Sequence, residues 1–480
     1  MYSMSEACIK SRGMLSESFT CGLGVRQGDV LSPLLFNIYV NDLPECFGND
    51  SNTPVLDEMP VSCLMYADDL VIFSLSEQGM QSKLNQLGEY CKKWFLNINV
   101  KKSKYLVLRS NRSVATGLTL LGKKLEQVSC YIYLGIEISD NGTMKSAQVN
   151  IKNRALKAVF KLRKLLRESH IRPTLSLKLF DQMIKPICLY GSEIWANPTY
   201  RNDQCPNNNK IWTSLEKLPV EKLYIRYCKF TLGVHSKASN YAVLGELGRY
   251  PLYIDVIVHM FNFYLHMKGG ESNNCFLQHA LNESVKMFKN NGKSWLTLLS
   301  HICATLHLPS IEYFTKRDVG TLKKTLRKKF DEIWLSTLNK PKSSSSGKLS
   351  TYRTFKSSIN FENYLSDIKE RRHAIALCKF RISAHRLKIE TGRYFKTPRE
   401  KRLCDYCKLS NQDVIEDEVH ALLVCAKYNA ARNEMINKVC RLCPIFTSLS
   451  NEQKFIYLMT AEKQIAEAVA KMCYNILYVI

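Results

Sequence analysis

The chain has 480 residues, of which 45% are hydrophobic and 23% are charged, a balance that excludes a disordered protein and allows roughly two to four globular domains. Its 68 lysines and arginines exceed its 43 acidic residues, giving a formal charge of +25, so we expect a polyanionic partner such as nucleic acid and no membrane. No apolar run reaches the length of a spanning helix and the first residues lack a signal-peptide pattern, so we expect an intracellular chain with reduced or metal-bound cysteines.

A glycine-rich stretch precedes the first predicted helix. It has three glycines within residues 22–28, and it is followed by Ser32 as the expected N-cap and Pro33 as the first helical residue. Such a stretch can present backbone N–H groups to a ligand, although it lacks the Gly-Lys-Ser/Thr of a phosphate-binding loop. Arg26 and Gln27 are therefore candidates to contact a nucleotide or a template base.

The next pattern places two adjacent carboxylates at the tip of a hairpin. Apolar segments of strand length at 61–65 and 70–73 flank the tetrapeptide Tyr-Ala-Asp-Asp at 66–69. Because Asp-Asp favours a tight turn over a strand interior, Asp68 and Asp69 are expected at the turn. Oxygen ligands with open positions suit Mg²⁺, although the tetrapeptide taken alone favours a solvated acidic turn.

An alternation of helices and hairpins continues to about residue 140, which favours an α+β fold. Helical spacing of apolar residues predicts a helix over 77–95, and short strands are predicted at 105–108 and 131–138. A long basic helix is predicted over 144–172, with an apolar side formed by residues such as Leu156 and Phe160. Its nine lysines and arginines, with no acid before Glu168, favour contact with a phosphate backbone over a merely solvated face.

Beyond residue 200 the patterns predict structure more than chemistry. Residues 202–209 form a polar loop and 340–347 a flexible linker. A basic helix pair is predicted over 361–390, and a closing amphipathic helix over 454–477.

One exception is a metal-binding pattern near the C-terminus. Cys404-x2-Cys407 and His420-x4-Cys425 supply four ligands, and the C-x2-C spacing suits tetrahedral Zn²⁺. Chance alignment in a cysteine-rich chain is the alternative. The basic residues that flank the pattern would suit a nucleic-acid backbone: Lys396, Arg399, Lys401, Arg402 and Lys408.

Several segments between residues 19 and 195 resemble, in order and spacing, motifs of the reverse transcriptases of non-LTR (LINE-type) retrotransposons. They are the template- and nucleotide-positioning motif at 19–36, the metal-binding motif at 66–69, the next palm motif at 96–104, the primer-grip hairpin at 133–135, and a stretch from the end of the thumb at 189–195. A Cys-Cys-His-Cys knuckle after the thumb is also frequent in this family.

The resemblance implies an incomplete right-hand polymerase palm followed by a mostly helical thumb and connector and a small zinc knuckle. The implied boundaries are a partial palm at 1–140, a helical thumb at 141–200, a helical connector at 201–339, a flexible linker at 340–350, and a basic helical C-terminal region at 351–480 with the knuckle at 404–425.

The resemblance also implies two-metal nucleotidyl transfer on an RNA template and a DNA primer, and a nuclear location. The implied roles are Mg²⁺ or Mn²⁺ binding by Asp68 and Asp69, nucleotide or template binding by Arg26, Gln27, Gly28 and Lys102 or Lys104, primer gripping by Tyr133, Leu134 and Gly135, and structural Zn²⁺ binding by Cys404, Cys407, His420 and Cys425.

The chain departs from the family at its start. Such enzymes need a further catalytic carboxylate and fingers upstream of the glycine turn, and only eighteen residues precede Phe19. We therefore expect the C-terminal portion of a reverse transcriptase that is inactive alone. The alternative is a non-catalytic RNA- or DNA-binding protein derived from such an element.

Overall fold

The computed structural model describes residues 6–22, 24–26, 28–48, 51–108, 117–168, 171–196, 208–269, 275–339 and 349–479. The predicted polar loop at 202–209 and the linker at 340–350 lie largely outside these residues, as does Gln27. The chain divides into two compact units. Unit 1 comprises 1–133, Ile138–Thr143 and Ser272–Lys286, and unit 2 comprises Leu134–Glu137, Met144–Glu271 and 287–480.

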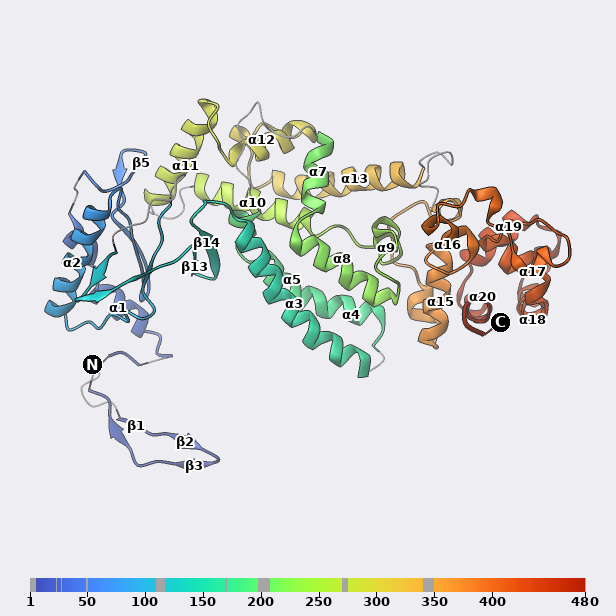
Figure 1. The fold of residues 1–480 in the computed structure, drawn as a ribbon, viewed down its shortest axis with the longest axis horizontal. Helices are drawn as coiled ribbons and strands as arrows, with labels where there is room; N and C mark the ends of the chain where they lie inside the picture. The colour runs from blue at the N-terminus through green and yellow to red at the C-terminus, as the bar shows by residue number, and fades with distance from the viewer. Residues whose placement is uncertain are drawn as a thin grey trace. The chain divides into compact units, whose positions relative to one another are not determined.

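Unit 1 contains nearly all of the strands, paired in two-stranded sheets (Figure 1). The antiparallel pairs are β1 (Glu6–Ala7) with β4 (Phe19–Thr20), β2 (Lys10–Ser11) with β3 (Met14–Leu15), β5 (Val55–Leu56) with β6 (Met59–Pro60), β7 (Cys63–Tyr66) with β8 (Asp69–Ile72), and β10 (Thr119–Leu120) with β11 (Lys123–Lys124). A parallel pair joins β9 (Lys104–Tyr105) to β12 (Glu126–Gln127). The last pair is β13 (Cys130–Tyr133) and β14 (Ile136–Ser139).

The core of unit 1 lies under helix α2 (Glu77–Lys93), which confirms the helix predicted there. Ser76 caps this helix by accepting a hydrogen bond from the Gly79 N–H at 3.1 Å. The buried residues of the core come from α2, from η1 (Leu43–Phe47), from β7 and from the segment around β10: Leu43, Phe47, Cys63, Leu84, Leu87, Tyr90, Cys91, Leu118, Leu120 and Leu125. The remaining helices are α1 (Ser32–Tyr39) and α11 (Cys275–Lys289).

Two local predictions in unit 1 need correction. Ser32 is not the N-cap of α1, because its hydroxyl donates to the Arg26 carbonyl at 2.6 Å and Leu31 occupies the cap position. The strand predicted over 131–138 is a hairpin, because Leu134 and Gly135 adopt positive φ angles of 46° and 78° and reverse the chain.

Unit 2 is helical from α3 to the C-terminus. Its first half contains α3 (Lys145–Glu168), α4 (Pro173–Leu179), η2 (Phe180–Ile184), α5 (Lys185–Leu189), α6 (Ser192–Trp195), α7 (Asn208–Glu216), α8 (Pro219–Leu232), α9 (Asn240–Glu246), α10 (Tyr253–Lys268), α12 (Leu296–Thr305), η4 (Ile311–Tyr313) and α13 (Asp318–Leu338).

Its second half contains η6 (Tyr352–Thr354), α14 (Tyr364–Asp367), α15 (Arg371–Arg381), α16 (Lys388–Tyr394), η7 (Arg399–Lys401), α17 (Asp405–Lys408), η8 (His420–Val424), η9 (Ala426–Tyr428), α18 (Asn429–Leu442), η10 (Pro444–Ser448), α19 (Asn451–Met459), α20 (Lys463–Tyr474) and η11 (Asn475–Val479). Within the described residues, no helix combines the length and apolarity needed to cross a bilayer.

Helix α3 is the long basic helix that the sequence predicts, but its buried side differs in detail. The buried positions recur every three or four residues: Ala147, Ile151, Ala155, Val159 and Leu162. Phe160, expected on the apolar side, is 58% exposed because it lies one position past this stripe. Exposed basic side chains also recur at helical spacing, namely Arg154, Lys157, Lys161 and Lys164. The helix therefore presents a continuous cationic face.

The C-terminal part of unit 2 is fastened to α9 by buried ion pairs. Arg381 on α15 pairs with Glu246 at 2.9 Å and with Glu362 at 2.8 Å. Its guanidinium is buried, so this member of the predicted basic helix pair is not available to phosphate. The closing helix predicted over 454–477 is two helices, since Thr460 (φ −104°, ψ 3°) leaves the helical conformation and the next helix begins only at Lys463.

Candidate active site and candidate metal centre

The two adjacent carboxylates lie at the tip of the β7–β8 hairpin, as predicted. The strands pair from Cys63 with Ile72 to Tyr66 with Asp69, which leaves Ala67 and Asp68 as a two-residue turn. Ala67 has a φ of 52°, in the left-handed region that such tight hairpin turns require. Asp68 therefore belongs to the turn and Asp69 begins β8, and both residues are exposed.

One face of the hairpin packs against the core of unit 1. Cys63 is buried in the core of unit 1, and Met65, Leu70 and Ile72 pack against that core. Because a two-stranded hairpin is only marginally stable alone, this packing fixes the position of its tip.

Tyr133, the last residue of β13, lies near the carboxylate pair. Burial raises the pKa of Tyr133, and the negative charge of Asp69 raises it further. The phenol therefore stays protonated and electrically neutral beside Asp69. The structure thus places Tyr133, predicted for the primer grip, near Asp69, predicted for the metal site.

No third acidic side chain completes the pair among the residues described. The one group of three or more His, Cys, Asp or Glu side chains found there with ligand atoms close enough to share an ion is the Cys-His cluster. In the described part of the chain, Asp68 and Asp69 are therefore an exposed carboxylate pair without a third acidic group beside them.

The glycine turn before α1 is tied to that helix. Besides the Ser32 contact with Arg26, the Asp29 carboxylate accepts a hydrogen bond from the Leu31 N–H at 3.0 Å. Gly28 has a φ of 91°, and a Cβ at this position would meet no atom within 4 Å. Glycine is therefore favoured here by the backbone conformation and not by a close contact. Gln27 lies outside the described residues.

The two candidate lysines are in different surroundings. Lys104 forms an ion pair with Glu126 at 2.5 Å, across the parallel β9–β12 pair. Lys102 is exposed, and its backbone N–H donates to the Asn99 carbonyl at 3.0 Å. Of the two ammonium groups, that of Lys102 is the more accessible to an incoming anion.

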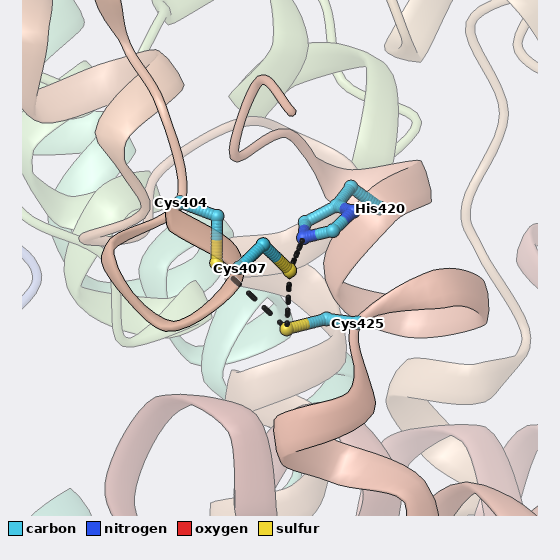
Figure 2. Close-up of side chains that lie close together, drawn as sticks. All are labelled: Cys404, Cys407, His420 and Cys425. Atoms are coloured by element: carbon cyan, nitrogen blue, oxygen red, sulfur yellow. Dashed lines mark hydrogen bonds between the residues drawn. The ribbon is translucent and has the colours of Figure 1, made fainter. Parts of the chain in front are cut away.

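The second site is a closed cluster of three cysteines and one histidine. Figure 2 shows the side chains of Cys404, Cys407, His420 and Cys425 pointing toward one another, and their ligand atoms all lie within 4.8 Å. The Sγ of Cys425 is 3.8 Å from the Sγ atoms of both other cysteines, and the Sγ of Cys407 is 3.4 Å from His420 Nε2. A tetrahedral zinc ion with Zn–S bonds of about 2.3 Å places two sulfurs about 3.8 Å apart. The cluster therefore fits Zn²⁺.

Local backbone geometry explains the spacing of the ligands. Cys404 precedes the short helix α17 and Cys407 lies within it, which turns both thiols the same way. His420 and Cys425 are joined by one π-helical turn, closed by the Cys425 N–H donating to the His420 carbonyl at 2.8 Å. The x4 spacing suits this turn, in which residues five apart meet.

Arg432 supports the cluster from α18, and sequence patterns did not indicate it. Its buried guanidinium donates to the carbonyls of Leu422 at 2.9 Å and Cys425 at 2.5 Å. These bonds satisfy the carbonyl end of the π turn, and the positive charge lies beside the ligand Cys425.

Burial also sets the protonation of the thiols. It raises the pKa of Cys425 to about 12 and raises that of Cys407, so without a metal these groups hold their protons near neutral pH. A bound cation reverses this balance, because thiolates are the form that ligates. All four ligands are buried, which leaves no open position for substrate.

Comparisons with known proteins agree with the motifs. Residues 2–138 match the family "Reverse transcriptase (RNA-dependent DNA polymerase)". The chain is 30% identical over 200 residues to a probable RNA-directed DNA polymerase from transposon BS of Drosophila melanogaster, covering 39% of this chain and 22% of that protein. It is 26% identical over 185 residues to the RNA-directed DNA polymerase from mobile element jockey of the same species, covering 36% and 19%.

A further relative is the Pol polyprotein from the type-1 retrotransposable element R2 of Popillia japonica, 25% identical over 180 residues, covering 35% of this chain and 24% of that protein. The matched region thus spans about a fifth of the length of the first two curated relatives. The predicted resemblance is confirmed: residues 2–138 match the reverse transcriptase family, and similar proteins are named as RNA-directed DNA polymerases from transposons and mobile elements.

Proposed function

We propose that this chain is the C-terminal portion of a non-LTR retrotransposon reverse transcriptase, and that the intact parent synthesises DNA on an RNA template. The observation that carries the proposal is the pair Asp68 and Asp69 at the tip of a core-anchored hairpin, within the segment that matches the family. The element order around it supports the same reading, with the glycine turn before the hairpin and the long basic helix α3 after it.

Asp68 and Asp69 would hold the divalent ions, Mg²⁺ or Mn²⁺. When bound, such ions stabilise the attacking and leaving oxygens of phosphoryl transfer. Both carboxylates are exposed and acceptor-only when ionised, which suits hard cations that also keep water and phosphate ligands.

Other residues of the chain would bind and orient the substrates. The turn from Arg26 to Gly28 would contact the nucleotide or template, and Gln27 belongs to this proposal by its place in the motif. Lys102 would contact the phosphate that leaves, and Lys104 is less suited because Glu126 already pairs with it. Tyr133, neutral and beside Asp69, would lie against the primer end together with Leu134 and Gly135.

The isolated chain would not extend a primer, because its carboxylate pair has no third acidic partner among the residues described. The experiment is primer extension on an RNA template with Mg²⁺ or Mn²⁺, comparing the chain with Asp68→Asn. The matched control is Asp413→Asn, an exposed aspartate near the Cys-His cluster. Templated synthesis that is lost in Asp68→Asn and kept in the control would overturn the proposed inactivity and confirm the metal site.

The Cys-His cluster would hold one structural zinc ion, and the surface around it would contact nucleic acid. Lys396, Arg399, Lys401 and Lys408 are exposed there. Arg402 is not equivalent to them, because its guanidinium donates to the carbonyls of Thr397 at 2.9 Å and Ile389 at 2.8 Å within the chain.

Binding of RNA and single-stranded DNA measured against salt concentration tests this part. Several phosphate contacts predict a steep fall in affinity between about 50 and 200 mM salt. A flat salt dependence would contradict nucleic-acid binding by the basic surfaces. Binding without primer extension is also what the non-catalytic alternative predicts. The nuclear location implied by the family stays a prediction.

A further inference from the structure

The turn of the β13–β14 hairpin, Leu134-Gly135, belongs to unit 2 and is held by two other side chains of the same unit. In a two-residue hairpin turn, the carbonyls of the central residues have no partner in the strand ladder and normally face water. Here the Tyr190 hydroxyl donates to the Leu134 carbonyl at 2.6 Å, and Arg154 Nη1 donates to the Gly135 carbonyl at 3.0 Å. Both carbonyls of the turn are therefore bound, by two different segments of the chain.

The two clamping side chains also contact each other and the turn itself. The Arg154 guanidinium lies 5.7 Å from the centre of the Tyr190 ring. A Cβ on Gly135 would lie 3.0 Å from Tyr190 Cε1, so the ring packs directly against this glycine. The absence of a side chain at 135 is what allows the phenol to reach the preceding carbonyl.

Tyr190 is itself fixed by its neighbours in the segment 189–195. Trp195, which is 1% exposed, donates from its indole to the Tyr190 carbonyl at 2.7 Å. Gly191 has a φ of 63°, and a Cβ there would lie 2.5 Å from the Ile136 side chain on β14. In this segment Tyr190 binds the turn, Trp195 fixes the backbone of Tyr190, and Gly191 leaves space for the Ile136 side chain.

From these contacts we propose that Tyr190 and Arg154 are positioning residues that hold the Leu134-Gly135 turn in the conformation that contacts the primer. The inference rests on the proposed function only for the identity of what the hairpin contacts. We call these two side chains the clamp. The clamp restricts the conformations of the turn, so the residues on either side of the turn are already ordered when a ligand binds. It gives the segment 189–195 a role that neither its composition nor its place after the basic helix reveals.

The first test of the clamp uses Tyr190→Phe, which removes one hydroxyl and keeps the ring against Gly135. Amide hydrogen exchange in peptides covering 130–139 should accelerate about fivefold, the effect of losing one net hydrogen bond. Tyr39→Phe is the matched control, because it removes a similar bond from a tyrosine hydroxyl to the Trp94 carbonyl, 2.6 Å long. Unchanged exchange in Tyr190→Phe would overturn the clamp.

Arg154→Met provides an independent variant if Tyr190→Phe folds poorly, and Arg154→Lys should restore part of the protection because it keeps one donor and the charge. The double variant Tyr190→Phe with Arg154→Met should exceed either single change, since both bonds hold one turn. A double variant no different from the control would overturn the inference.

The second measurement separates the clamp from the proposed function. A primer–template with a photoreactive 3′-terminal nucleotide should crosslink to residues 133–135 of the wild-type chain, and the yield should fall at least threefold in Tyr190→Phe. Affinity for single-stranded RNA should change less than twofold. Faster exchange with no wild-type crosslink would support the clamp and count against the primer role. A wild-type crosslink that Tyr190→Phe leaves unchanged would overturn the positioning role.

Discussion

The carboxylate hairpin and the Cys-His cluster are both short sequence signatures on tight turns, yet they differ in almost every physical respect. The hairpin tip is exposed and supplies two adjacent acceptors, Asp68 and Asp69. The cluster is buried and supplies four converging ligands from residues 404–425. The cluster has enough converging groups for a tetrahedral metal site, whereas the proposed metal site at the hairpin would need substrates and further residues to complete it. The closed arrangement of the cluster suits a structural metal ion, and the open arrangement of the hairpin suits a catalytic one.

The difference extends to what the rest of the fold contributes. The hairpin packs against the core of unit 1 through Cys63, Met65, Leu70 and Ile72, and its two-residue turn is exposed. The cluster is enclosed by a π turn, and its backbone is fixed by the buried guanidinium of Arg432. Stability is therefore expected to depend strongly on the cluster and hardly on the carboxylates, and the following predictions test that contrast.

The largest effect is expected from Cys404→Ser. The wild-type chain should bind about one zinc ion, and the variant should lose most of it together with several kcal/mol of stability in the C-terminal region, because zinc binding and folding are coupled. Metal analysis by mass spectrometry and thermal unfolding measure both quantities. Cys440→Ser is the control, since Cys440 lies outside the cluster. A wild-type chain that takes up no zinc when zinc is supplied would refute the metal centre.

A smaller effect is expected when the support of the cluster is removed and its ligands are kept. Arg432→Met should lower zinc affinity about 10- to 100-fold, the usual cost of losing a group that orients metal ligands. Arg432→Lys should lie in between, because it keeps the charge but loses the forked donor. Competition against a chromophoric chelator gives the affinity, with Arg441→Met on the same helix as control. Equal zinc affinities in all four proteins would show that the Arg432 guanidinium does not influence the metal site.

Sequence patterns revealed what lies close together along the chain. The Asp68-Asp69 turn follows from flanking apolar segments, and the Cys-His cluster follows from ligand spacing. Arg432 was not found, and the segment that contains Tyr190 was noted without its contact, because each of these side chains acts on backbone carbonyls. Tyr190 and the carbonyl it binds are 56 residues apart. Because every residue has a backbone carbonyl, the residue type at position 134 gives no indication that a distant side chain binds there.

Errors in the predicted elements have the same origin. Phe160 was assigned to the buried side of α3 because it is apolar, but the buried stripe follows the smaller residues Ala155 and Val159. Ser32 was expected to cap α1, but its hydroxyl donates to the Arg26 carbonyl instead. In both cases the prediction relied on residue type alone, and the local backbone geometry decided which way the side chain points.

Glu221 in unit 2 is a buried carboxylate, in contrast to the exposed Asp68 and Asp69. Burial raises the pKa of Glu221 to about 8, although its side chain accepts a hydrogen bond from the Tyr253 N–H at 2.9 Å. Between the unfolded pKa near 4.5 and the folded pKa, the folded chain holds a proton that the unfolded chain has released. The free energy of unfolding should therefore fall as pH rises through this window.

Glu221→Gln removes this dependence by keeping the side chain neutral. The variant should be more stable than the wild type by on the order of 4 kcal/mol at pH 8 and by less than about 1 kcal/mol near pH 5. Urea unfolding at both pH values measures the change, and the exposed Glu452→Gln is the control. A wild-type advantage at pH 8 would mean that the ionised carboxylate is the stabilising form.

The smallest effect is expected from Asp68→Asn. Because the side chain is exposed in a turn, stability should change by less than about 0.5 kcal/mol, and the loss of repulsion with Asp69 acts in the stabilising direction. The variant should nevertheless lose the response to divalent ions. If the pair binds Mg²⁺, millimolar Mg²⁺ stabilises the wild type in proportion to its occupancy and stabilises Asp68→Asn less. Urea titrations with and without Mg²⁺ separate the two effects. A loss of more than about 2 kcal/mol without metal would show that this carboxylate holds the fold, and the contrast with the Cys-His cluster would then fail.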